Sequence, residues 1–102
     1  MTPEIAARRN DIEQICRRYG VRRLELFGSA ATGAFRPGTS DFDFLVDLGD
    51  AQPVAYADAY FGLRESLEAL LGGKVDLVTA PSVSNPYFRE SIDRTKQVLY
   101  AA

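Results

Sequence analysis

Histidine is absent from this chain of 102 residues. Without an imidazole, the chain cannot contain a Ser/His/Asp or Cys/His triad, a zinc site with histidine ligands or a histidine general base. Its single cysteine, Cys16, has no second cysteine in the chain with which to form a disulfide. The groups left to carry chemistry are carboxylates, hydroxyls, backbone amides, lysine and arginine.

Other common patterns are also missing. The chain has no G-x-x-x-x-G-K-[ST] loop and no G-x-G-x-x-G, which excludes a P-loop and a dinucleotide-binding fingerprint. A net charge of -2 offers no basic stripe for extended nucleic-acid binding. No segment approaches the length of a membrane span, and the N-terminus lacks the apolar region of a secretory signal. We therefore expect a soluble, cytoplasmic protein with no membrane contact.

The composition, 46% apolar and 25% charged, is that of an ordinary globular chain, and we expect one domain over residues 1–102. Hydrophobic periodicity predicts helices over residues 3–19 and 54–71 and a helix that begins at Asn85-Pro86. Strands are predicted over residues 21–27, 41–48, 74–79 and 97–100, with a short helix after the first strand. The connection between the first two strands is short for a parallel crossover, so we expect an α/β fold with a small, mixed, partly antiparallel sheet and flanking helices.

Asp41 and Asp43 stand one residue apart at the start of a predicted strand. Strand alternation puts both on one face with Cα atoms roughly 6.5 Å apart, and like charges so placed repel each other in a partly desolvated site. A divalent cation removes that penalty. Because no histidine or cysteine is near, the oxygen ligands favour Mg²⁺ or Mn²⁺, as one ion or as a pair. Asp41 alone has a plainer reading as a turn residue at the strand entry.

Asp76, in KVDLV, is a third acid inside an apolar strand and is costly to bury without a partner. If its strand lies beside the second strand, Asp76 joins Asp41 and Asp43 on one face. The sequence then predicts the three-aspartate cluster that a two-metal phosphoryl-transfer site uses.

Gly28-Ser29, at the end of the first strand, is a candidate phosphate-binding turn. The glycine lets a phosphate approach the backbone, the serine offers an amide and a hydroxyl, and a short helix opening there adds free N–H groups. Such pairs are common in turns, so the pair alone is uninformative. Together with the acids it predicts a metal-nucleotide site, the alternative being a degenerate site that only binds.

The stretch LFGSAATGAFRPGTSDFDFLVDL followed by GGKVDLVTA resembles the minimal nucleotidyltransferase family of the polymerase-beta-type superfamily, over nearly the whole chain. The resemblance implies that Gly28 and Ser29 contact a triphosphate. It implies that Asp41 and Asp43 bind both metal ions, and that Asp76 binds the catalytic ion and is a candidate base. Many relatives carry an arginine in the loop where this chain has Thr32, and Arg36 is the nearest replacement cation.

The resemblance also implies an activity. With Mg²⁺, an acceptor hydroxyl would attack the α-phosphorus of ATP, and AMP would pass to a tyrosine of a helical HEPN-domain toxin, so that the chain acts as its antitoxin. A chain of this size leaves little room for an acceptor pocket, which also favours an acceptor on another protein. Two alternatives stay open: a non-catalytic antitoxin that neutralises its partner by binding, and, less favoured, a small-molecule nucleotidyltransferase of the aminoglycoside type.

Several side chains outside the motifs have predicted places. Cys16 belongs to an apolar helical stripe and is expected in the core. Lys74 and Asp47 are expected at the surface. The aromatic residues of the two later helices are expected to pack into the core, with some serving as anchors for a partner: Tyr56, Tyr60, Phe61, Tyr87 and Phe88.

Overall fold

The computed structural model describes residues 1–50, 52–79 and 84–102. Its centre is a sheet of four strands in the order β3-β2-β1-β4. The strands are β1 (Arg23–Phe27), β2 (Phe42–Asp47), β3 (Val75–Thr79) and β4 (Gln97–Ala101). Both β2 and β4 run antiparallel to β1, whereas β3 runs parallel to β2. The predicted mixed sheet and its antiparallel first pair are therefore confirmed.

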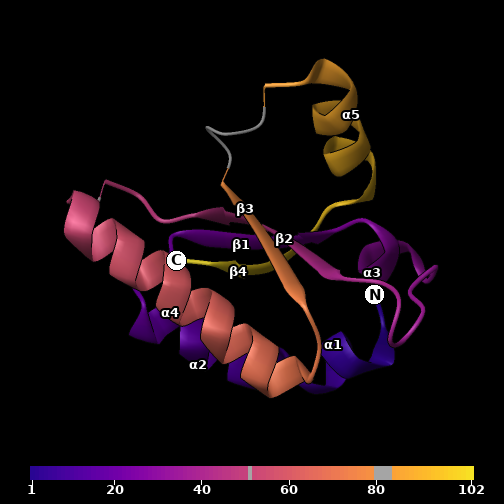
Figure 1. The fold of residues 1–102 in the computed structure, drawn as a ribbon, viewed down its shortest axis with the longest axis horizontal. Helices are drawn as coiled ribbons and strands as arrows, with labels where there is room; N and C mark the ends of the chain where they lie inside the picture. The colour runs from indigo at the N-terminus through magenta and orange to yellow at the C-terminus, as the bar shows by residue number, and fades with distance from the viewer. Residues whose placement is uncertain (51, 80–83) are drawn as a thin grey trace.

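Helices cover the two faces of this sheet unequally (Figure 1). On one face lie α1 (Pro3–Ala7), α2 (Arg9–Arg18) and α4 (Pro53–Leu71), and on the other lies α5 (Pro86–Thr95). The short α3 (Ser29–Thr32) follows β1 directly. No helix within residues 1–50, 52–79 and 84–102 is long and apolar enough to cross a lipid bilayer.

The main core lies between the sheet and the face covered by three helices. Fully buried side chains from both layers meet there, among them Ile5, Ile12, Cys16, Leu24, Leu26, Phe44, Leu63 and Leu67. Cys16 is in the core as predicted, and burial, with a smaller effect of Glu13, raises the pKa of its thiol to about 12. The thiol is therefore protonated and unreactive at neutral pH.

The first helix was predicted as one continuous element, and this was wrong. The chain leaves helical geometry at Arg8, whose φ is -104° and ψ 11°, so that α1 and α2 are separate helices. Hydrogen bonds to α3 hold the N-terminal residues that precede α1. The N–H of Thr2 donates to the carbonyl of Ala30, and the terminal amine of Met1 donates to the carbonyl of Ala31. These bonds dock the start of α1 against α3.

The prediction that the helical aromatic residues fill the core was also partly wrong. Tyr56 and Tyr60 do pack against the core cluster. Phe61, Tyr87 and Phe88, by contrast, are 54%, 82% and 41% exposed. For Tyr87 and Phe88 the reason is that α5 buries only Ile92, which forms a small second cluster with Phe27, so that the other faces of the helix are exposed. Phe61 lies on α4, whose buried side chains are Leu63 and Leu67.

Candidate active site

The predicted acids lie on the face of the sheet toward α5, opposite the main core. In β2, Phe42, Phe44 and Val46 face the main core. Strand alternation places Asp41 and Asp43 on the other side. The parallel β2–β3 ladder pairs Asp43 with Asp76 directly, so the predicted adjacency of these two residues is confirmed. Asp47, farther along β2, is exposed as predicted.

The carboxylates influence one another. The pKa of Asp43 is raised from 3.8 to about 6, first because the group is partly buried and then because Asp76 and Asp41 are negatively charged nearby. An acid placed next to two others is destabilised in its ionised form. This is the electrostatic condition that a bound cation relieves.

The oxygen donors suit a hard divalent cation, although they are not gathered around one position. Among residues 1–50, 52–79 and 84–102, no group of three or more acidic or cysteine side chains is placed closely enough to hold a metal ion as it stands. Asp41 instead pairs with Lys74, whose Nζ lies 3.8 Å from its Oδ2. The residue types and their common face therefore fit Mg²⁺, although their present side-chain positions do not form a complete ligand set.

Gly28 lies beside the acids because Phe27, the residue before it, pairs with Asp43. Its φ of 72° and ψ of -150° are available only to glycine at low cost. A Cβ built on Gly28 would also lie 2.5 Å from Oδ2 of Asp43. Both the backbone conformation and the space require glycine here.

The predicted phosphate donors are only partly free. The N–H of Gly28 donates to Oγ1 of Thr95 at 3.1 Å, so this amide is already occupied. Ser29 and Ala30 open α3, where N–H groups have no acceptor within the helix. Arg36 lies exposed in the following connection, and no ion pair of its guanidinium is found in the described part of the chain.

The site has neighbours that sequence reasoning did not single out. Glu25, in the middle of β1, is 6% exposed, and Oε1 accepts from Arg23 at 3.1 Å while Oε2 lies 3.9 Å from Lys96. Glu25 could have been singled out from the sequence, because it is an acid inside the apolar strand RLELF, just as Asp76 is an acid inside KVDLV. Thr95 carried no signal, because its contact with Gly28 joins positions 67 residues apart.

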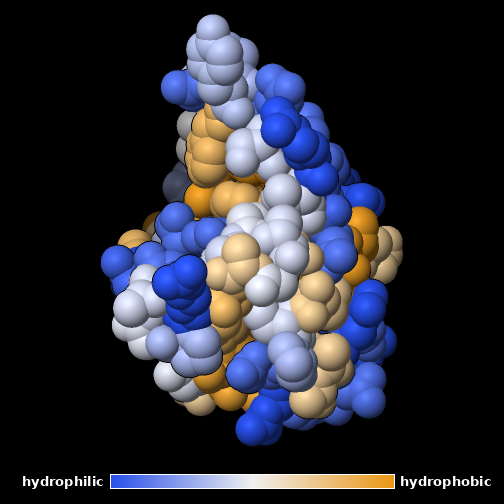
Figure 2. Space-filling model, turned by 90° about the vertical axis from the view of Figure 1, so that its right-hand side faces the viewer, coloured by the Kyte–Doolittle hydropathy of each residue, from blue (hydrophilic) through white to orange (hydrophobic). Residues whose placement is uncertain are grey.

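Helix α5 lies on the same face of the sheet as the acids. In Figure 2, which shows the side of the molecule that carries α3, α5 forms an upper lobe, and hydrophobic surface gathers where that lobe meets the body. Contacts on this side include the edge-on pair of Phe27 and Phe88, whose ring centroids are 5.9 Å apart. The acids therefore lie on the more open face of the sheet, next to a helix with exposed aromatic residues.

Sequence comparison finds related proteins. Residues 9–99 match the family model described as "Nucleotidyltransferase domain". A Methanocaldococcus jannaschii protein named "Putative protein adenylyltransferase" is 40% identical over 76 residues, which are 74% of this chain and 74% of that protein. "Protein adenylyltransferase MntA" of Thermococcus cleftensis is 37% identical over 73 residues, covering 72% of this chain and 70% of the relative.

Solved structures share the fold. One described as "Structure of putative minimal nucleotidyltransferase" matches with a TM-score of 0.68 and 33% identity over 91% of this chain and 90% of its own. A complex described as a tri-AMPylated Shewanella oneidensis HEPN toxin with an MNT antitoxin matches with a TM-score of 0.61 over 95% of this chain and 72% of the other. At 20% identity, that second match establishes the fold alone.

Proposed function

Because this chain belongs to the nucleotidyltransferase domain family, we propose that it is a Mg²⁺-dependent protein adenylyltransferase acting as an antitoxin. It transfers AMP from ATP to a tyrosine hydroxyl of a HEPN-type toxin. The observation that carries this proposal is the pairing of Asp43 with Asp76 on the face that also bears Asp41. The names of the relatives support adenylylation of a protein. The family resemblance and the fold match to a toxin complex support the partner.

The chain's own groups would bind the triphosphate at the end of β1. The hydroxyl and N–H of Ser29 and the N–H of Ala30 donate to phosphate oxygens, as amides at a helix start do for anions. Gly28 leaves room for the phosphates to approach the backbone. Arg36 adds a cation from the following connection, in place of the loop arginine that Thr32 replaces.

Asp41, Asp43 and Asp76 would hold Mg²⁺, as two ions in the family pattern. Bound Mg²⁺ supplies positive charge that offsets the repulsion of the carboxylates and favours an ionised acceptor hydroxyl. The acceptor oxygen forms a bond to the α-phosphorus, the bond from that phosphorus to the bridging oxygen breaks, and pyrophosphate leaves. Asp76 accepts the proton of the acceptor hydroxyl. The product is an AMP ester of the acceptor.

The acceptor would come from the partner protein. Tyr87 and Phe88 are exposed on α5, on the same side of the sheet as the acids, and exposed aromatic side chains are frequent anchors in protein interfaces. Binding of a partner on this side would bring its tyrosine to the more open face, where the acids lie.

Neutralisation of the toxin in cells separates catalysis from binding. We expect the double variant Asp41→Ala/Asp43→Ala to bind the HEPN-type partner in a pull-down and yet fail to rescue growth. Asp58→Ala, which removes an exposed acid of α4, is the matched control and should rescue growth fully. Full rescue by the double variant would overturn the enzymatic account and establish an antitoxin that acts by binding alone.

A further inference from the structure

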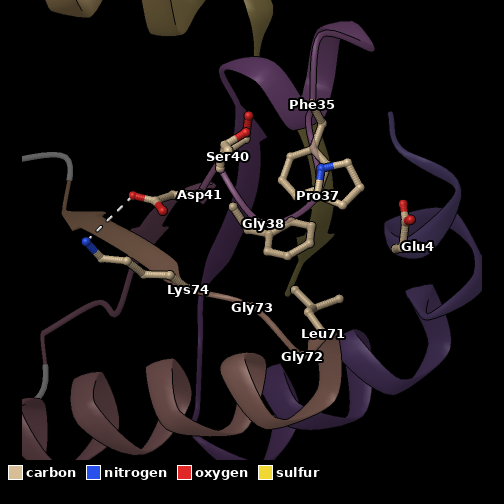
Figure 3. Close-up of a pocket in the computed structure, with 12 residues that line it drawn as sticks. Glu4, Phe35, Pro37, Gly38, Ser40, Asp41, Leu71, Gly72, Gly73 and Lys74 are labelled. Carbon is tan, nitrogen blue, oxygen red and sulfur yellow. Dashed lines mark ion pairs between the residues drawn. The ribbon is translucent and has the colours of Figure 1, made fainter.

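A cavity of about 350 Å³ lies at the end of the sheet where β2 and β3 begin (Figure 3). It is formed between the connection 35–40 and residues 71–74. Its wall includes Asp41 but none of Gly28, Ser29, Asp43 and Asp76. The cavity is therefore a separate hollow that touches the carboxylate cluster at one residue, and its volume is within the range of small-molecule sites, roughly 300–1,000 Å³.

The walls of this cavity are flat and largely apolar. Phe35 and Phe42 both line it and stack on each other, with ring centroids 4.5 Å apart and 26° between planes. A Cβ on Gly73 would lie 2.9 Å from Cε2 of Phe42, so the glycine lets that ring keep its position. Aromatic faces beside bare backbone suit a planar ring, and stacking of a base on an aromatic side chain is worth about 1–3 kcal/mol.

The two ends of the cavity carry charge. At one end is the ion pair of Asp41 and Lys74, and at the other is Glu4 on α1 (Figure 3). A triphosphate held by the acids would have its phosphates beside the ammonium of Lys74. The carboxylate of Glu4 accepts hydrogen bonds and can therefore receive an exocyclic amino group at the far end of a base.

We propose that this cavity binds the nucleobase of the nucleoside triphosphate. The inference rests on the proposed function for the presence of a triphosphate at the acids, and it adds the place where the base is recognised. The cavity begins at Asp41, one of the acids proposed to hold the triphosphate through Mg²⁺. This continuity with the proposed phosphate site favours the base of the bound nucleotide as the occupant. Recognition depends on stacking at Phe35 and on the amino group facing Glu4.

Calorimetric titration of the purified protein in excess Mg²⁺ tests this inference without any partner. The ligands are α,β-methylene-ATP, which resists transfer, and inorganic tripolyphosphate, which has no base. We expect Phe35→Ala to weaken binding of α,β-methylene-ATP by about tenfold or more, as loss of stacking predicts, and to leave tripolyphosphate binding unchanged. Phe61→Ala removes an exposed phenylalanine that does not line this cavity and should change neither affinity.

A second variant tests the far end of the cavity while keeping its volume. The wild-type protein should prefer α,β-methylene-ATP to the corresponding uridine analogue, because uracil has no exocyclic amino group, and Glu4→Gln should reduce that preference. Both variants are first checked for wild-type thermal unfolding.

Two results would overturn the inference: equal affinity of Phe35→Ala and wild type for α,β-methylene-ATP, or parallel losses of affinity for α,β-methylene-ATP and tripolyphosphate. If the wild type binds neither ligand, the proposed function itself fails. If the wild type binds α,β-methylene-ATP but Phe35→Ala binds it equally well, only the proposed base site is refuted and the proposed function stands.

Discussion

Gly28 lies so close to Asp43 that a Cβ atom added to the glycine would be 2.5 Å from Oδ2 of the aspartate. The strand register causes this contact, because Phe27 and Asp43 are paired across the β1–β2 ladder. The glycine of the proposed phosphate-binding turn and one of the proposed metal ligands therefore meet at one point. A side chain added at residue 28 must therefore displace the Asp43 carboxylate.

Replacement of Gly28 tests this contact. Gly28→Ala places a side chain on a backbone with φ of 72° and displaces the Asp43 carboxylate, which should abolish transfer. Gly33→Ala is the comparison for a positive φ in the left-handed helical region, because Gly33 has φ of 84° and ψ of 2° with nothing within 4 Å of its Cβ position. We expect Gly33→Ala to cost about 1–2 kcal/mol of unfolding free energy and Gly28→Ala about 1–3 kcal/mol more, in urea denaturation. Equal costs would contradict the close contact.

Asp43 should make the metal-free protein less stable as pH rises. Its pKa is 3.8 when unperturbed and about 6 in the fold, so between these values the unfolded chain loses its proton first, and unfolding becomes easier. Asp43→Asn should therefore raise the melting temperature at pH 7.5 and have little effect below pH 4. Mg²⁺ should stabilise the wild type more than the variant. A melting temperature at pH 7.5 that is unchanged by Asp43→Asn, with the exposed Asp58→Asn as reference, would refute the prediction.

Thr95 should position Gly28, since its Oγ1 accepts the Gly28 N–H at 3.1 Å. Thr95→Val keeps the shape of the side chain but leaves a part-buried amide without its acceptor, a cost of about 1–3 kcal/mol. We expect weaker binding of Mg·α,β-methylene-ATP in calorimetry, and recovery with Thr95→Ser, which retains the hydroxyl. If valine and serine behave alike, the hydrogen bond has no part in arranging the turn.

If Asp41 is a metal ligand as proposed, Lys74 should compete with the metal ion for it, because Nζ of Lys74 lies 3.8 Å from Oδ2 of Asp41. Lys74 is 75% exposed on its side chain, so its ion pair should add no more than about 1 kcal/mol to stability. Lys74→Met should therefore leave the melting temperature nearly unchanged and, without nucleotide, increase Mn²⁺ affinity severalfold in a calorimetric or paramagnetic titration. Lys96→Met is the comparison, because Lys96 lies on the same side of the sheet but pairs with Glu25 and Asp93 instead of Asp41. It should leave Mn²⁺ affinity unchanged. Weaker Mn²⁺ binding by Lys74→Met would show that Lys74 supports the metal.

Much of this arrangement was predictable from the sequence, because alternation in short strands fixes which side chains share a face. The position of Asp76 beside Asp43 followed once β3 was placed next to β2. The shared face of Asp41 and Asp43 and the antiparallel pairing of β1 with β2 could both be predicted from residues that lie close together in the sequence.

What could not be predicted depends on contacts between distant segments. The break at Arg8 has no glycine or proline to announce it, and the hydrogen bond between Thr2 and Ala30 that docks α1 joins residues far apart in the sequence. Apolar periodicity did not reveal that α5 buries only one side, leaving Tyr87 in solvent. The hydrogen bond from Gly28 to Thr95 joins residues 67 positions apart, which no local pattern connects.

Transfer of labelled AMP tests the central claim most directly. The purified protein is incubated with Mg²⁺, ATP labelled at the α-phosphate and the proposed HEPN-type partner protein, and labelled protein is measured after separation. The account predicts label on a tyrosine of the partner, lost with Asp41→Ala/Asp43→Ala and retained with Asp58→Ala. A stable complex that carries no label would contradict it.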